Sequence, residues 1–314
     1  MEDRKKYSED IVDKIRQELK EFFSKDDFSS LDVTVVVTGS YGRNEASQAS
    51  DMDWFVASKT TLTPDIEKQV EEGVLSIVEK YVKKNVGNTG TFGGVVTESE
   101  LLVNFGGEDD TNKRFTRRML YLLESKYLYN ENLYKDIKGK ILSKYIKNDV
   151  PDSGLNRFIL NDVIRYYRTI CTDYEYKVFE DGKLWGVRKI KLRFSRKLLY
   201  FSGLVTVATT CSLTRNDKIN KTTDLLNLSP IERIQKIFGD EQTKRMMCLY
   251  SEFLQLISEP AIRASLDSVK RENRNENDDY RRLKNLSEHF NWEMEKCFKQ
   301  GFSPSHPIHA AMIF

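Results

Sequence analysis

The chain is poor in the residues that build metal clusters and disulfide frameworks. Its 314 residues include only four cysteines and three histidines, and the cysteines, at positions 171, 211, 248 and 297, are widely spaced with no Cys-x-x-Cys pair. Structural zinc sites and small disulfide scaffolds need closely spaced ligands or bridges. The sequence therefore predicts four reduced thiols, and it excludes a zinc-finger or disulfide-rich class.

Long apolar runs and an excess of either charge are also lacking. No stretch approaches the roughly 20 apolar residues that a membrane span requires, and the N-terminal residues have no apolar core of a signal peptide. Fifty basic side chains nearly cancel 48 acidic ones. No overall field favours nucleic acid or a membrane surface. We therefore expect a cytoplasmic enzyme without a membrane partner, whose contacts with any nucleic acid would be local.

The most informative stretch runs from residue 33 to residue 58. An apolar β-branched run, Val33–Val37, leads into Gly39-Ser40, and a second apolar run follows Asp51-Met-Asp53. This pattern predicts a strand, a glycine turn, a short helix and a second strand that carries both aspartates. Side chains two residues apart on a strand share a face. Two carboxylates so placed provide the hard oxygen ligands that Mg²⁺ or Mn²⁺ prefers.

This arrangement resembles the nucleotidyltransferase superfamily of the DNA polymerase β fold, whose signature is glycine followed by glycine or serine, a short spacer, and Asp-x-Asp on the next strand. Within the superfamily, Gly39-Ser-Tyr-Gly-Arg-Asn-Glu45 and Ser50-Asp-Met-Asp53 look most like the uridylyltransferases of the nitrogen regulatory protein and their uncharacterised bacterial relatives. The resemblance covers about residues 30 to 130. It implies that Asp51 and Asp53 bind the metal and act in catalysis, and that Gly39 and Ser40 contact the phosphates of an NTP.

A third carboxylate completes the metal site in that superfamily, and here its identity is left open. The sequence contains no apolar-Asp-apolar triplet on the expected later strand, and the candidates are Glu98, Glu100, Asp109 and Asp110. All four can equally be acids of the first turn of a helix, where the helix dipole stabilises them. Arg43 and Glu45 have two readings as well, a site role or an ordinary ion pair on a helix surface.

The second half of the chain is dominated by helix-period patterns. We expect an α+β protein: a small mixed-sheet nucleotidyltransferase core with an N-terminal helix in residues 1–150, and an α-helical domain in residues 151–314 that completes the cleft for nucleotide and acceptor. Six basic residues lie between Arg188 and Lys197. By the same resemblance, Lys191 and Ser195, one helical turn apart, would hold the β- and γ-phosphates. The alternative reading is a solvated basic helix.

Taken together, these features predict a nucleotidyltransferase. It would transfer a nucleoside monophosphate from an NTP such as ATP to an acceptor hydroxyl with release of pyrophosphate, using Mg²⁺ or Mn²⁺. The acceptor would be a protein or an RNA, tRNA included, and a homo-oligomer is compatible with this reading. Two alternatives stay open: a catalytically silent nucleotide sensor or toxin-antitoxin partner, and a synthase of cyclic or oligonucleotide signals.

Overall fold

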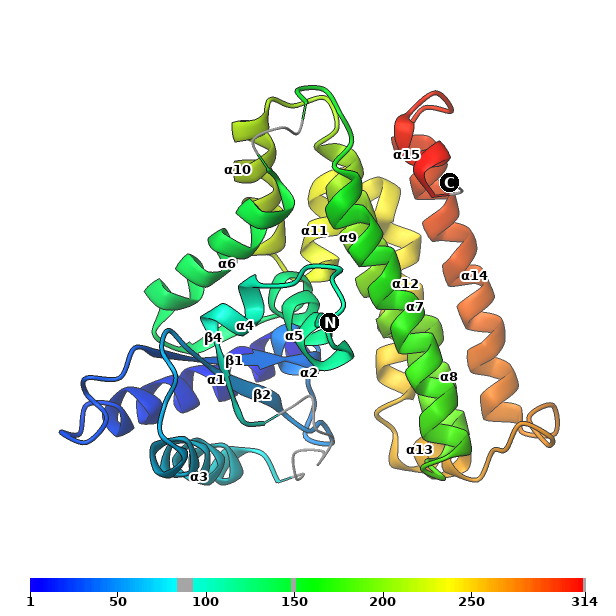
Figure 1. Ribbon diagram of the computed structural model, residues 1–314. Coiled ribbons are helices and arrows are strands. Elements are labelled where there is room, and N and C mark those ends of the chain that lie inside the picture. Colours follow the sequence, from blue (N-terminus) through cyan, green and yellow to red (C-terminus); the bar gives the residue numbers. More distant parts are fainter. Residues whose placement is uncertain (84–92, 148–150, 313–314) are drawn as a thin grey trace. The chain divides into compact units, whose positions relative to one another are not determined.

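A computed structural model describes residues 1–83, 93–147 and 151–312 (Figure 1). The chain divides into two compact units, Met1–Lys147 and Asn148–Phe314, and each is described by itself. The predicted α+β class is confirmed, because a small mixed sheet lies in a largely helical protein. The roles predicted for the two domains stay predictions.

The first unit is built on a four-stranded sheet in the order β3-β2-β1-β4. Strand β1 pairs antiparallel with both β2 and β4, and β2 pairs parallel with β3. The elements of this unit, in chain order, are α1 (Glu2–Phe22), β1 (Val33–Thr38), α2 (Gly39–Gly42), β2 (Asp53–Ser58), α3 (Pro64–Tyr81), β3 (Val95–Thr97), α4 (Glu98–Leu102), α5 (Asn112–Leu123), β4 (Lys126–Tyr129) and α6 (Glu131–Tyr145).

Helices cover both faces of this sheet. Apolar side chains of α1 and α3 pack against Val35, Trp54 and Val56 on one face. On the other face Phe55 meets the ring of Tyr121 from α5, with centroids 6.2 Å apart. Figure 1 shows α3 on one side of the strands and α4 and α5 on the other. Burial on both faces explains why β1 is a continuous apolar run without alternation.

Two expectations about local structure are corrected. The apolar spacing of residues 8–25 predicts a helix that starts at Ser8, but α1 begins at Glu2. Ser8 is buried inside the helix, and its hydroxyl donates to the Arg4 carbonyl (2.7 Å) and accepts from the Ala46 amide (3.0 Å). From residue 111 onward the sequence predicts helices, but strand β4 lies there, because its four residues are too few for an alternating pattern to stand out. The glycines of residues 87–94 predict a turn-rich return to the sheet, and this stretch lies outside the described residues as far as position 92.

The second unit consists of helices, with no strand among its described residues. They are α7 (Arg157–Phe179), α8 (Trp185–Lys191), the π-helical segment η1 (Leu192–Arg196), α9 (Lys197–Thr209), α10 (Arg215–Leu226), α11 (Pro230–Phe238), α12 (Asp240–Leu256), α13 (Pro260–Asp267), α14 (Asp278–Gly301) and α15 (Pro307–Ala311). Within the described ranges, no helix has the length and apolar character needed to cross a membrane.

Helix α9 forms the centre of this unit, and it contacts α7, α10 and α11. Almost every side chain from Leu198 to Ala208 is buried, which explains why this helix has no polar face. Just before it, Phe194 of η1 stacks on Phe253 of α12 with the ring centroids 4.2 Å apart. This stacking fixes the π-helical segment against the core.

Candidate functional site

The predicted turn between β1 and β2 brings a glycine against an aspartate. Gly39 has φ +66°, a conformation that L side chains rarely adopt. A Cβ placed on Gly39 would lie 2.8 Å from Oδ2 of Asp53. Asp53 itself is the first residue of β2 and pairs with Thr38 in the β1–β2 ladder. Both the backbone conformation and the nearby carboxylate therefore require glycine at position 39.

Asp51 lies two residues before Asp53 but not on the strand. Strand β2 begins at Asp53, so the expectation that both aspartates lie on it holds for Asp53 alone. Met52 between them is fully buried, whereas both aspartates are half-buried. Burial raises the pKa of Tyr41 well above its usual value, and a hydrogen bond with Tyr7 and the negative charge of Asp51 add to that rise. The Asp51 carboxylate therefore acts on the side chain of Tyr41 in α2.

Behind the turn lies a buried ion network that the sequence did not reveal. The Arg43 Nε donates to Glu45 Oε2 (2.8 Å), and its Nη1 donates to Glu124 Oε2. All three side chains are at most 7 % exposed. The surface reading of Arg43 and Glu45 is therefore wrong. A Cβ on Gly42 would lie 2.1 Å from the Glu124 carbonyl oxygen, so close packing and charge pairing together hold the turn against the segment that precedes β4.

Glu124 could have been suspected as a charged residue that ends an apolar run, Met119–Leu123. Its partner, however, lies 81 positions earlier in the chain. No local pattern reports a contact at such a separation. Ser40, the other predicted phosphate ligand of this turn, is half-buried in α2, and its carbonyl accepts from the Glu45 amide (2.8 Å).

None of the four candidates for the third carboxylate joins the aspartate pair. In the described parts of the chain, no group of three or more acids, histidines or cysteines is arranged to hold a metal ion. Thr97, which directly precedes Glu98, pairs with Ser58 at the end of β2. Ser58 lies five residues after Asp53 along this strand, so Glu98 and Glu100 follow the end of β2 that is away from Asp53. At about 3.3 Å per strand residue this separation is roughly 17 Å.

Contacts of their own occupy three of these acids. Glu98 pairs with Lys140 (2.8 Å). Glu100 forms a capping box with Thr97; burial alone would raise its pKa, but hydrogen bonds from Thr97 and the charges of Arg114 and Arg117 lower the pKa overall. Asp110 is buried and receives two bonds from the Arg118 guanidinium, and Asp109 is exposed. The first-turn reading fits Glu98 and Glu100, which open α4.

Lys191 and Ser195 belong to the second unit. Lys191 is the last residue of α8 and is half-buried, and Ser195 lies in η1 with 7 % of its surface exposed. A π-helical turn holds more residues than an α-helical one. The predicted spacing of Lys191 and Ser195, one regular α-helical turn apart on the same face, is therefore changed by the π turn. Their predicted role toward phosphate stays a prediction.

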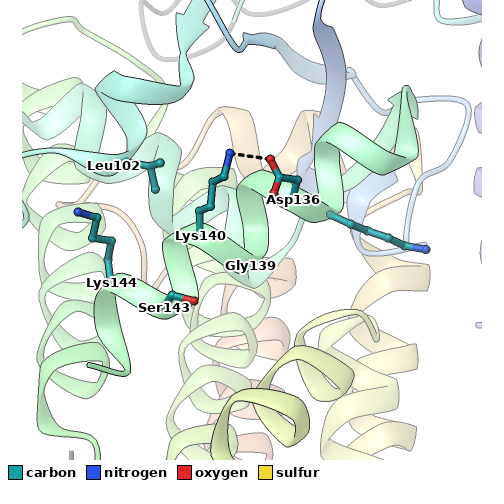
Figure 2. A pocket seen from close by; sticks show the side chains of 7 residues that line it. Leu102, Asp136, Gly139, Lys140, Ser143 and Lys144 are labelled. Carbon is teal, nitrogen blue, oxygen red and sulfur yellow. Dashed lines mark ion pairs between the residues drawn. The ribbon is translucent and has the colours of Figure 1, made fainter. Parts of the chain in front are cut away.

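The first unit also carries an open hollow of about 510 Å³, which lies on α6 beside Leu102 of α4 (Figure 2). Its lining includes none of the predicted site residues. Lys140, which reaches across it, pairs with Asp136 (2.7 Å) as well as with Glu98, and Lys135 pairs with Glu131 (2.7 Å). Two of its cations are thus already neutralised by acids of the protein, and the hollow has no evident chemistry.

The aspartate pair fits a divalent cation of the magnesium type. Two half-buried carboxylates offer hard oxygen ligands, and Mg²⁺ is commonly bound by one or two carboxylates while water and substrate phosphates complete its shell. The space that a Cβ at position 39 would fill stays open beside Asp53. The residues present therefore suit a metal that is shared with a phosphate-bearing substrate.

Comparison with known families agrees with this geometry. The family model described as Nucleotidyltransferase domain matches residues 12–97, a segment that contains the turn, both aspartates and β3. A comparison of the whole chain with curated proteins gave no match.

Proposed function

We propose, from the match of residues 12–97 to the nucleotidyltransferase domain, that this protein transfers a nucleoside monophosphate from an NTP to an acceptor hydroxyl and releases pyrophosphate. The observation that carries the proposal is the position of the Asp53 carboxylate beside Gly39, where a Cβ would lie 2.8 Å from Oδ2, with Asp51 two residues earlier in the chain. The matched family supports nucleotidyl transfer in general. Metal dependence and the acceptor are parts of our proposal.

Each residue of the turn has a defined task in this proposal. Asp51 and Asp53 would hold Mg²⁺ or Mn²⁺, which when bound stabilises negative charge on the phosphates. Gly39 leaves room for a phosphate to approach the backbone, and the Ser40 hydroxyl donates a hydrogen bond to it. The buried network of Arg43, Glu45 and Glu124 holds the turn in place and does not itself contact substrate.

Lys191 and Ser195 are proposed to contribute from the second unit. An ammonium group offsets the charge of the β- and γ-phosphates, and a hydroxyl adds a directional bond. The acceptor is proposed to be a hydroxyl of a protein or of an RNA, tRNA included. The motif likeness of Gly39–Glu45 to the protein uridylyltransferases favours a protein.

Transfer of label tests the function directly. The pure protein is incubated with each labelled NTP in Mg²⁺ or Mn²⁺, together with total protein, total tRNA or no acceptor. Incorporation in one channel supports the proposal, and product in the acceptor-free channel identifies a signal synthase. An Asp51→Asn, Asp53→Asn variant should abolish the label. The matched control is Asp26→Asn, Asp27→Asn, which removes the same charge from two exposed neighbouring acids.

One observation favours a second candidate, a protein that binds a nucleotide without converting it to product. The four candidate acids do not complete the aspartate pair, and in the described residues no third ligand accompanies it. A protein of this kind would bind NTP through the same aspartates and produce no label in any channel. Binding that depends on Asp51 and Asp53 without incorporation would therefore favour the sensor over the enzyme.

A further inference from the structure

The second unit contains a strongly basic pocket that the proposed function does not use. It has a volume of about 280 Å³. Its walls come from α7, α8, η1, the loop before α14, and α14 itself, and α8 and η1 both contact α14. Its charged lining residues are five cations and one acid: Lys189, Arg193, Arg271, Arg274, Lys284 and Glu175. The pocket thus has four positive charges in excess.

These cations differ from those of the hollow on α6. None of the five makes an ion pair with an acid in the described part of the chain, whereas Lys135 and Lys140 on α6 are paired. The Nε of Arg193 is buried and has no hydrogen-bond partner there either. A buried donor without a partner is costly unless something binds it. The pocket therefore offers positive charge that no ion pair neutralises in the described residues, and one donor, the Nε of Arg193, that has no partner there.

Packing holds Arg193 in place. Arg193 lies in η1, next to the stacked Phe194, and its Nη1 donates to Ser287 Oγ of α14 (3.2 Å). Trp185 and Tyr280, whose ring centroids are 5.2 Å apart, form the apolar wall beside it. Their burial, 8 % and 2 % exposed, shows that this wall is part of the core. The site is therefore rigid on the side of Arg193.

The crowding of charge is visible at Lys189. Burial lowers the pKa of Lys189, the positive charges of Arg193 and Arg271 lower it further, and Glu175 only partly compensates. Arg271 and Arg274 stand on an exposed loop, and the guanidinium of Arg274 bonds to the Arg271 carbonyl. A bound anion would relieve the repulsion among these groups.

We propose that this pocket is a binding site for a compact oligophosphate, the phosphate chain of a nucleotide or an inorganic polyphosphate, held without a metal. The excess of four positive charges matches a chain of three phosphates. The volume lies at the lower end of ordinary ligand pockets, which suits a phosphate chain with any base outside it. Single-stranded RNA fits less well, because its phosphates follow a groove and do not converge on one pocket.

This proposal is independent of the proposed function, and removal of metal separates the two. The aspartate pair repels phosphate unless a cation lies between them, whereas the basic pocket needs none. Titration calorimetry of the full chain in EDTA with tripolyphosphate should therefore show one binding site. The affinity should fall steeply with added salt.

Charge neutralisation locates the site. Arg271→Gln, Arg274→Gln should weaken tripolyphosphate binding by about tenfold or more, because both charge-assisted contacts are lost. These arginines are exposed, so the fold should be unaffected, and Lys189→Gln gives an independent variant with the same expectation. The matched control, Lys221→Gln, Lys244→Gln, removes two exposed charges from α10 and α12 and should leave the affinity unchanged. Asp51→Asn, Asp53→Asn should also have no effect in EDTA.

Four results would overturn the proposal: no binding in EDTA, equal losses in the control variant, a loss in the aspartate variant, or tighter binding of a short single-stranded RNA than of tripolyphosphate. ATP distinguishes the two sources of the phosphate chain. Tighter binding of ATP than of tripolyphosphate supports a nucleotide ligand, and equal binding supports the phosphate chain alone.

Discussion

The two candidate phosphate sites of this protein have opposite charge. The turn in the first unit presents two carboxylates, Asp51 and Asp53, whereas the pocket in the second unit presents five cations and one acid. The first can bind phosphate only through a cation that both share, and the second can bind it directly. Activation of a phosphate and its simple retention require different surroundings, and we propose that this chain contains one site of each kind.

The largest expected effect is on the acidic site. Asp51→Asn, Asp53→Asn keeps the shape of the turn and removes both charges, so transfer of label in Mg²⁺ should fall on the order of a thousandfold. The rate of incorporation at saturating NTP measures this effect. If the double variant kept more than a tenth of the activity, the two carboxylates would not be needed to hold a metal. The proposed difference between the acidic site and the basic pocket would then be wrong.

Breaking the network behind the turn should mainly affect stability. Arg43→Ala leaves the buried carboxylates of Glu45 and Glu124 without their shared cation, and the free energy of unfolding should fall by about 3–5 kcal/mol. Denaturant unfolding of the full chain measures it. The control is Lys59→Ala, which breaks an exposed pair with Asp32 (3.6 Å) and should cost less than about 1 kcal/mol. Equal losses in both variants would show that the buried network contributes no more to stability than an exposed ion pair does.

Gly39→Ala should affect stability and activity together. The new Cβ meets Asp53 and the residue must hold a positive φ, so we expect a loss of about 1–3 kcal/mol in stability and weaker metal binding. Gly106→Ala is the control, because Gly106 has φ +73° but open space around its Cβ position. A similar loss of activity in both variants would exclude the contact with Asp53 as the cause.

Lys191→Ala tests whether the basic helix takes part in NTP binding. NTP affinity in Mg²⁺ should fall by about tenfold, which corresponds to the loss of one charge-assisted contact. Tripolyphosphate binding in EDTA should not change, since Lys191 does not line the basic pocket. A lower melting temperature with unchanged NTP affinity would instead indicate a solvated face.

The smallest effect concerns pH in the second unit. His306 caps α15, where its Nδ1 accepts from the Ile308 amide (3.1 Å), and burial together with the charge of His309 lowers its pKa below 6.5. The neutral form is favoured in the folded state, so this stabilisation is complete above pH 6.5 and declines as the pH falls below it. His306→Asn keeps an acceptor without titrating. Its melting temperature should fall less than that of the original protein between pH 7 and 5, and parallel curves would exclude His306.

The local parts of the fold could be predicted from the sequence. The apolar run of β1, the glycine turn and the helix start at Thr63, whose hydroxyl accepts from the Ile66 amide, all follow from neighbouring residues. The predicted small mixed sheet is also confirmed, as the antiparallel and parallel pairings of its four strands show. The pairing of Arg43 with Glu124 could not be predicted, because it depends on how β4 returns to β1 and not on any local pattern.

The basic pocket, too, could be predicted only in part from the sequence. The run from Arg188 to Lys197 is visible in the sequence, but it supplies only Lys189 and Arg193 to the pocket. The other cations come from about 80 to 95 positions later in the chain, and they meet the first two because α13 packs against α8 and α14 packs against α8 and η1. Periodicity can place residues on one helix face, but it cannot tell which other helix lies opposite.

The π-helical segment η1 makes this region sensitive to chain length. A π turn accommodates one residue more than an α turn, so a deletion of one residue between Leu192 and Arg196 would allow a regular helix from α8 to α9. The helices before and after the segment would keep their faces, because the wide turn takes up the extra residue locally. A deletion would therefore act mainly on η1 itself, which supplies Arg193 to the basic pocket and Phe194 to the aromatic stack with Phe253.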